Sequence, residues 1–293
     1  MRDKKRSIPN VLILLAAYNG SLWIEDQINS ILNQKNVKIK VLVSIDISDD
    51  DTLQICQNIC ELNKNVEILN FEKKFGNAAK NFFRLIKDAE FEDFDFIGLS
   101  DQDDIWLEEK ISYSIEKIIY EKCNAFSSSI LAWWPNHKTK MIKKSWKQKK
   151  YDYLFESAGP GCTYLFEKKP FQEFKNFLQM NWDDINEIEF HDWIIYAYFR
   201  INNFKWYIDD LPLIKYRQHM NNYFGINIGF KAFKKRAKLI KNNWYRNEVI
   251  KIKNILNIKK DIDLKFRIKN FFHLRRRPRD VFAFLIFNIL GLY

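Results

Sequence analysis

The first 120 residues alternate between short apolar runs and longer segments in which apolar residues recur at helical spacing. The apolar runs, each typical of a strand covered on both faces, are residues 11–17, 40–45, 66–70 and 94–99. The segments with helical spacing are residues 22–32, 52–63, 77–89 and 107–120. Strands that alternate with helices predict βαβ units, and therefore an α/β fold built around a mostly parallel sheet with flanking helices.

Acidic residues gather where the second and fourth predicted strands end. Residues 46–51 include four Asp, and residues 101–104 have the sequence Asp-Gln-Asp-Asp. Because ligands bind at the carboxyl ends of strands in open parallel sheets, this placement predicts a binding site. Alternate carboxylates in a turn suit a hard divalent cation that keeps positions open for phosphate oxygens, although Asp-rich surface turns are common. An EF-hand is excluded, since Trp106 stands where that loop needs Gly.

The pattern is less regular after residue 120. Residues 137–150 hold seven Lys and no acidic residue, which is typical of an exposed loop. Residues 188–199 have helical spacing that begins near His191, and residues 205–208 can form a strand. These shorter elements are predicted to belong to the same domain as the first half of the chain.

Charge divides the chain into two parts. The formal net charge is +11, but residues 231–280 contain 18 Lys and Arg against 4 Asp and Glu, whereas residues 1–230 carry a net charge of −3. Apolar residues at positions 230, 233, 237, 240 and 244 predict a basic amphipathic helix. This tail suits the surface of an anionic membrane. The second interpretation is a helical cap on the body or at an oligomer contact, and the last is nucleic-acid binding, for which no motif is present.

No segment of the sequence is expected to cross a membrane. The uncharged residues 281–293 would reach about 20 Å as a helix, short of a hydrocarbon core of ~30 Å. The apolar run at residues 11–17 is short for a signal peptide, and we interpret it as a buried strand. The four cysteines lack zinc-ligand spacing and are predicted to be free, buried thiols in a reducing compartment.

Five stretches, taken in order, resemble the family 2 glycosyltransferases of the inverting GT-A type. The resemblance extends over about residues 8–224, and the Ser-Asp-Gln-Asp-Asp-x-Trp form of residues 100–106 is typical of the bacterial rhamnosyltransferase-like branch. The stretches are residues 16–20 together with 30–34, residues 43–52, residues 99–106, residues 191–193, and residues 216–219 together with 221–222. Each stretch is weak by itself, whereas the ordered set is specific.

The resemblance implies that four residues bind the donor nucleotide. Tyr18 would stack on a pyrimidine, and Asp46 would accept a hydrogen bond from its ring N–H. Asp101 would lie near the ribose, and Gln102 belongs to the same nucleotide-binding turn. A carboxylate acceptor recognises uracil or thymine by the N3–H group. The family usually has two adjacent acids in the turn after the second strand; here Ile45 replaces the first, which leaves Asp46 as the candidate.

The resemblance also implies a metal ion and a general base. Asp103 would ligate Mg²⁺ or Mn²⁺, which neutralises the diphosphate leaving group, and His219 would help to hold the metal or the diphosphate. An ordinary hydrogen-bonded histidine is the alternative for His219. Asp192 would take the proton from the acceptor hydroxyl in a single in-line displacement, with Glu189 as the alternative base. An Asp in a first helical turn can instead complement the helix dipole.

The activity implied by the resemblance is inverting transfer of a sugar, with rhamnose favoured, to a hydroxyl of a glycan. The favoured donor is dTDP-rhamnose, and a UDP-hexose is the alternative. The acceptor would be a lipid-linked glycan of a bacterial surface polysaccharide, reached from the cytoplasm by a protein lying peripherally on the inner face of the membrane. A sugar-nucleotide-binding scaffold without activity is the rival function. Other enzyme motifs, such as the P-loop and the zinc-protease helix, are absent from the sequence.

The expected organisation follows from the same resemblance. Residues 1–225 would form the GT-A catalytic domain. Its nucleotide-sugar half would extend to about residue 110 and its acceptor half over residues 111–225. Residues 226–293 would form a basic, amphipathic helical extension.

Overall fold

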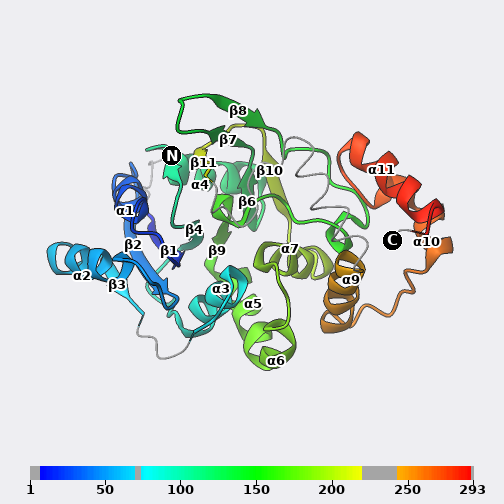
Figure 1. Cartoon of the computed structure of the whole chain (residues 1–293), viewed down its shortest axis with the longest axis horizontal. Coiled ribbons are helices and arrows are strands. Elements are labelled where there is room, and N and C mark those ends of the chain that lie inside the picture. Colours follow the sequence, from blue (N-terminus) through cyan, green and yellow to red (C-terminus); the bar gives the residue numbers. More distant parts are fainter. Residues whose placement is uncertain (1–6, 70–73, 220–242, 292–293) are drawn as a thin grey trace, which may run out of the picture.

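A seven-stranded sheet forms the centre of the molecule (Figure 1). The computed structural model describes residues 7–69, 74–219 and 243–291. The strand order is β10-β6-β9-β4-β1-β2-β3, and every neighbouring pair is parallel except those of β9, which is antiparallel to β4 and β6. The strands are β1 (Asn10–Ala17), β2 (Lys38–Ile45), β3 (Val66–Ile68), β4 (Phe96–Asp101), β6 (Ala125–Ser128), β9 (Leu165–Glu167) and β10 (Trp206–Asp209). The predicted α/β fold with a mostly parallel sheet is confirmed.

The two faces of β1 pack into two separate hydrophobic cores. Leu12 and Leu14 belong to one core, and Ile13 and Leu15 belong to the other. Successive side chains of a strand point to opposite faces, so a continuous apolar run is what a strand covered on both sides requires. The sequence pattern of β1 therefore follows directly from its central position.

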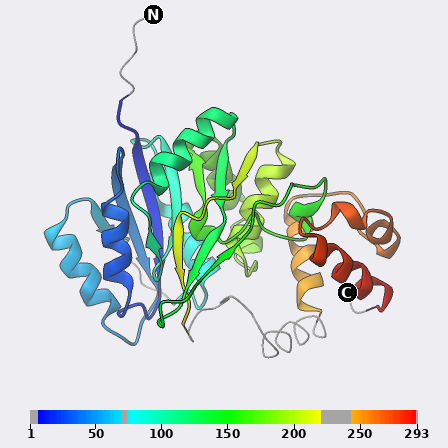
Figure 2. The same ribbon diagram turned by 90° about the horizontal axis from the view of Figure 1, so that it is seen from above.

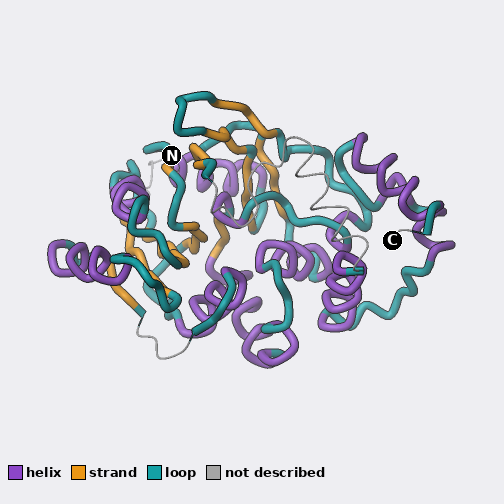
Figure 3. Tube along the Cα trace, in the orientation of Figure 1, coloured by secondary structure: helices purple, strands orange, loops and turns teal. Residues whose placement is uncertain are grey.

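Helices cover both faces of the central sheet (Figure 3). Residues of α3, α5 and α7 contribute to the core that contains Leu12, and residues of α1, α2 and α4 contribute to the core that contains Ile13. The helices are α1 (Ile24–Leu32), α2 (Thr52–Leu62), α3 (Ala78–Asp88), α4 (Lys110–Glu121), α5 (Lys168–Met180), α6 (Trp182–Ile185) and α7 (His191–Ile201). The chain thus forms three layers, with the sheet in the middle.

A second, four-stranded sheet lies beside the first, in the order β5-β11-β7-β8. Its strands are β5 (Ile105–Trp106), β7 (Ile130–Trp133), β8 (Thr139–Ile142) and β11 (Ile214–Arg217). Residues 137–150, expected to be an exposed loop, contain the edge strand β8, so this expectation was wrong in part. Thr139–Ile142 pairs antiparallel with Ile130–Trp133, and an edge strand accommodates exposed Lys side chains.

The C-terminal part packs at the end of the molecule opposite α1 and α2 (Figures 1 and 2). It contains α9 (Trp244–Ile255), α10 (Leu264–Lys269), the short 3₁₀ helix η3 (Phe271–His273) and α11 (Pro278–Ile289). Val249 and Ile252 of α9 and Phe284 of α11 join the core formed by α3, α5 and α7. Residues 278–289 therefore pack against the body of the molecule. Among the described residues, no helix is long and apolar enough to cross a membrane.

Two expectations for this region concern residues that the structure does not describe. The predicted amphipathic helix begins at residue 230, and of its apolar positions only Trp244, at the start of α9, is described. The expected boundary at residue 225 also lies outside the described residues.

Candidate active site

The strands β1, β2 and β4 end at the same level, which brings three turns together. Ala17 of β1 pairs with Ile45 of β2, and Ala16 pairs with Asp101 of β4. The turns that follow carry Tyr18, Asp46 and the 101–104 carboxylates. The edge predicted from the sequence as a binding site is therefore a single place in the fold.

Asp46 is buried and its carboxylate accepts three backbone hydrogen bonds. The donors are the N–H groups of Ile47 at 2.8 Å, Phe75 at 2.8 Å and Gly76 at 2.7 Å. A carboxylate offers about four lone-pair positions, so one acceptor position is left for another donor. Asp46 thus fixes the turn at residues 75–76, where Gly76 has a φ of 82°, which favours glycine.

Gln102 clamps the backbone of Tyr18. Its Oε1 accepts from the Tyr18 N–H at 2.7 Å, and its Nε2 donates to the Tyr18 carbonyl at 2.6 Å. The Tyr18 side chain is 45% exposed. A Cβ atom at Gly20 would lie 2.2 Å from Gln102 Oε1, so only glycine leaves room for this clamp. The turns after β1 and β4 are therefore joined, and the tyrosine ring faces outward.

The structure brings Asp103 and His219 into direct contact. Asp103 Oδ2 lies 2.8 Å from His219 Nε2, and the two residues are 116 positions apart in the chain. The His219 ring stacks on Trp23 with 3.9 Å between ring centroids. Arg217 donates from Nε to the Asp103 carbonyl at 3.0 Å. This hydrogen bond connects the end of β11 to residues 101–104, which we call the acidic turn. The sequence analysis did not name Trp23, and it included Arg217 in the motif at residues 216–219 without giving it a role.

Asp101 and Asp104 form a cluster with Cys162, whose ligand atoms all lie within 4.8 Å of one another. Burial raises the pKa of Asp101 to about 7, and the charges of Asp103 and Asp192 add to the effect. Burial also raises the pKa of Asp104 well above its usual range. Burial raises the pKa of the Cys162 thiol, which keeps it protonated. The turn therefore concentrates carboxylates that need either protons or a cation, and oxygen ligands suit Mg²⁺ or Mn²⁺.

Lys110 lies beneath the acidic turn, and the sequence analysis missed it. Its Nζ lies 3.6 Å from the centroid of the Trp106 ring. Burial lowers its pKa to about 7, while the neighbouring Cys162 and Asp104 act in the opposite direction. The signal was present in the sequence, because Lys110 occupies a position in the buried stripe that Ile111, Ser114, Ile115 and Ile118 form along α4.

Asp192 lies in the first turn of α7, and its surroundings tune its acidity. Burial raises its pKa to about 6. The Ser157 hydroxyl, the N–H groups of Trp193 and Asp192 itself, and the charge of Lys144 act in the opposite direction. The charge of Asp192 also raises the pKa of Asp101, so the two carboxyls are close enough to interact electrostatically. Ser157 and Lys144 were not predicted, since neither belongs to a recognisable motif.

The neighbours of Asp192 are less suited to proton transfer. Glu189 Oε2 accepts a hydrogen bond at 2.8 Å from the indole N–H of Trp244, a residue of the C-terminal part. This oxygen is therefore already engaged in a structural contact. The ring of His191 stacks on Phe82 at 3.9 Å, and burial lowers its pKa to about 3. A Cβ atom at Gly161 would lie 2.3 Å from His191 Nε2, so the ring occupies the space that glycine leaves.

Comparison with known proteins places the chain in a family. Residues 12–179 match the profile of Glycosyl transferase family 2. The dTDP-rhamnosyl transferase RfbG of Shigella flexneri is 42% identical over 289 residues, which are 95% of this chain and 100% of that protein. The chain belongs to glycosyltransferase family 2. As a member of this family it is a glycosyltransferase, which confirms the resemblance drawn from its motifs.

Two solved structures share the fold of this chain. TarS of S. aureus, residues 1–349 in complex with UDP, is 18% identical with a TM-score of 0.53, over 90% of this chain and 72% of that one. The mannosyltransferase PcManGT of Pyrobaculum calidifontis, in complex with GDP-Man and Mn²⁺, is 12% identical with a TM-score of 0.54, over 98% and 86% of the two chains. At these identities the likeness concerns the fold alone, and it agrees with the GT-A arrangement of this family 2 transferase.

Proposed function

We propose that the protein is a metal-dependent, inverting rhamnosyltransferase that uses dTDP-rhamnose. The observation that carries the proposal is the set of carboxylates at the ends of β2 and β4, beside Tyr18 at the end of β1, in a family 2 transferase. Identity of 42% to a dTDP-rhamnosyl transferase along almost the whole chain favours rhamnose over the alternative, a UDP-hexose.

The donor nucleotide would bind between the turns after β1 and β2. The exposed ring of Tyr18 offers a flat face on which a base can stack. The two hydrogen bonds between Gln102 and the Tyr18 backbone hold this residue in place. Asp46, with one acceptor position left, would accept from the N3–H of thymine. Asp101, which ends β4, would lie beside the ribose.

A divalent cation, Mg²⁺ or Mn²⁺, fits the acidic turn. Asp103 and His219 would hold it, with Asp101 close by, because their side chains converge there and because burial leaves the carboxylates short of compensating charge. When bound, the ion supplies positive charge to the diphosphate leaving group. Asp103 and His219 contribute to this step by fixing each other's orientation, and Trp23 holds the imidazole plane.

Asp192 would act as the general base. With a pKa of about 6 it is ionised at neutral pH and still basic enough to accept a proton from the acceptor hydroxyl. Attack by that oxygen on the anomeric carbon, with departure of the nucleoside diphosphate, inverts the configuration. Glu189 is the weaker candidate because the Trp244 N–H already occupies its carboxylate.

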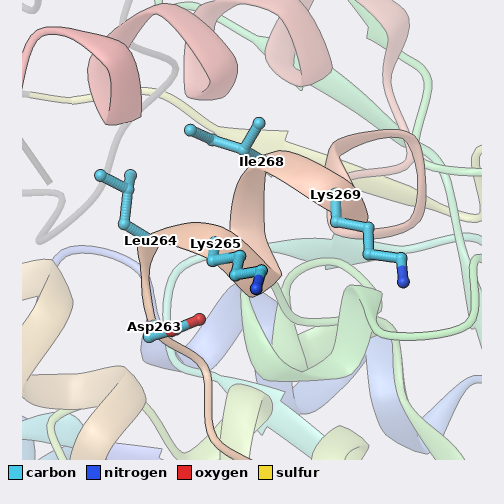
Figure 4. A pocket seen from close by; sticks show the side chains of 5 residues that line it. All are labelled: Asp263, Leu264, Lys265, Ile268 and Lys269. Atoms are coloured by element: carbon cyan, nitrogen blue, oxygen red, sulfur yellow. The ribbon is translucent and has the colours of Figure 1, made fainter.

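The acceptor would be a lipid-linked glycan of a bacterial surface polysaccharide, reached at the inner face of the cytoplasmic membrane. The support is the surface of α10, η3 and α11, which we call the apolar-basic face. It exposes the apolar side chains of Leu264, Ile268, Phe272, Phe282, Ile286 and Ile289. Figure 4 shows Leu264 and Ile268 on α10 around a hollow that Lys265 and Lys269 also line. Apolar residues mixed with Lys suit an anionic lipid surface.

Release of nucleoside diphosphate from UDP-, dTDP- and GDP-sugars, each with Mn²⁺, Mg²⁺ or EDTA, tests the function. We expect dTDP release from dTDP-rhamnose with a metal ion, and none with EDTA. Release from a UDP-hexose alone would favour the alternative donor. Where no donor is hydrolysed, a lipid-linked acceptor is added; dTDP-rhamnose binding without any transfer would then support a non-catalytic scaffold.

A further inference from the structure

Two arginines of the basic C-terminal part pack against the catalytic body; Arg276 is buried and Arg275 is half-buried. Arg275 and Arg276 lie between η3 and α11, and Arg276 is only 7% exposed. A buried guanidinium requires several acceptors to offset its lost hydration. Arg275 also donates to the Tyr245 hydroxyl at 2.8 Å, and Arg276 Nε lies 3.7 Å from Asp152 Oδ2. Their other partners are in the turn at residues 155–159, which we call the base turn.

Arg276 binds the base turn through both its backbone and its side chain. Its N–H and its Nε contact the Glu156 carboxylate, with Nε 3.3 Å from Oε1, and its Nη2 donates to the Ser157 carbonyl. Arg275 Nη1 donates to the Phe155 carbonyl. Three successive residues of the base turn are therefore held by two arginines from a segment about 120 positions away.

The base turn in turn contacts Asp192. The Ser157 hydroxyl is placed between the Gly159 carbonyl, 3.1 Å away, and the Asp192 carboxylate. The hydroxyl of the buried Tyr164 donates to the Gly159 carbonyl at 2.9 Å and lies 3.4 Å from the Asp192 carbonyl. Movement of the base turn would therefore move the Ser157 hydroxyl beside the Asp192 carboxylate and the Gly159 carbonyl that holds Tyr164.

We propose that Arg276 is a positioning residue for sugar transfer, because it fixes the base turn that holds Asp192 against the acceptor hydroxyl. This inference rests on the proposed role of Asp192 as the base. The C-terminal part then contributes to the active site in addition to packing against the body and carrying the apolar-basic face. Geometry of this kind governs the rate steeply, since small displacements of a base from its proton reduce catalysis.

The experiment compares Arg276→Gln with Arg267→Gln, a matched variant. Arg267 is 8% exposed and donates hydrogen bonds to Asn288 Oδ1 and to the Ile262 carbonyl, both inside the C-terminal part. We expect Arg276→Gln to lower kcat about tenfold at an unchanged donor KM. Arg267→Gln should keep kcat while losing comparable thermal stability.

A pH profile separates positioning from simple loosening of the fold. The groups that face Asp192 are Ser157 and Tyr164, the cation Lys144 and the carboxyl of Asp101. The Ser157 hydroxyl lowers the pKa of Asp192, and we expect Arg276→Gln to displace this hydroxyl. The pKa of Asp192 should then rise, so the decrease of kcat at low pH should begin at a higher pH. Ser157→Ala should reproduce this movement, and it decides the matter if Arg276→Gln does not fold.

The outcomes of the proposal and of the proposed function are distinguishable. Equal loss of kcat in both arginine variants, or an unmoved acidic limb in both Arg276→Gln and Ser157→Ala, would overturn the inference. Full transfer by Asp192→Asn would instead remove the proposed base and leave the role of Arg276 without a target. If Arg276→Gln has a normal kcat and Asp192→Asn is inactive, the positioning role of Arg276 is wrong and the proposed role of Asp192 as the base stands.

Discussion

At the scale of single residues, the site is built from side chains whose charges are not fully compensated. Asp101, Asp104 and Asp192 each have a raised pKa because burial penalises the carboxylate. His219 and Arg217 approach the same turn from the end of β11. Such concentrations of perturbed groups are typical of functional sites, and they favour a cation as the missing charge.

Replacing Asp103 tests the metal assignment. Asp103→Ala removes the carboxylate that contacts His219, so metal-dependent turnover should fall by at least about 100-fold. Initial rates across a Mn²⁺ titration measure the effect. Asp49→Ala, which removes an exposed carboxylate from the neighbouring acidic turn, is the matched control and should keep its rate. Turnover like that of the wild type in Asp103→Ala would exclude Asp103 as a ligand.

Replacing Asp192 tests the base. Asp192→Asn keeps the size of the side chain but cannot accept the proton, so transfer should be lost while dTDP-rhamnose binding is retained. The measurements are calorimetric donor affinity and product formation with acceptor. Unchanged transfer would move the role of base to Glu189 or to another group.

The pH dependence of the wild type follows from the same group. Asp192 acts in its ionised form, and burial raises its pKa to about 6. The rate should therefore rise as the pH rises through about 6 and should decline below it. A rate of transfer that stays constant between pH 5 and 7 would contradict Asp192 as the base.

At the scale of elements, long or strongly patterned segments were predicted well, and several short ones were missed although β3 and β10 were predicted. The helix α5 was missed although Phe171, Phe174 and Leu178, all buried, lie at helical spacing. The strands β6, β7 and β11 are each four residues long, too short for a period to identify. The antiparallel insertion of β9 between β4 and β6 depends on contacts across the chain.

The N-terminus of α3 offers a test at this scale. The Asn77 side chain accepts from the Lys80 N–H at 2.8 Å and thereby caps the helix. Asn77→Ala should lower the free energy of unfolding by about 1 kcal/mol, measured by urea denaturation. Asn77→Ser, which restores a capping oxygen, should recover most of the loss. Equal losses in both variants would mean that the cap contributes little.

At the scale of the whole molecule, charge and apolar surface are concentrated at the C-terminal end. The body up to residue 230 has a net charge of −3, whereas residues 231–280 carry +14 from their 18 basic and 4 acidic residues. The helices there contribute buried residues to the core and also carry exposed apolar side chains. An end of this kind favours attachment to an anionic surface over uniform solvation.

Removing apolar side chains from the apolar-basic face tests the membrane proposal. The triple variant Phe272→Ser, Phe282→Ser and Ile286→Ser should sediment with phosphatidylglycerol vesicles at least tenfold less than the wild type. Leu62→Ser, Tyr120→Ser and Met180→Ser change exposed apolar residues elsewhere and should sediment normally. If the first variant binds the vesicles as well as the wild type does, the apolar-basic face is not the membrane-binding surface. A change of its oligomeric state in gel filtration would favour the alternative of a contact between copies.

The sequence by itself determined the layered α/β architecture, the family and the residue types of the site. Continuous apolar runs and helical stripes are local signals, and the motif residues lie in short contiguous stretches. Only the tertiary structure decided which of these residues meet. Asp103 meets His219 across 116 positions, and the base turn meets Arg276 across about 120. The physical reason is that ion pairs and buried hydrogen bonds depend on distance in space, which the order of residues does not specify.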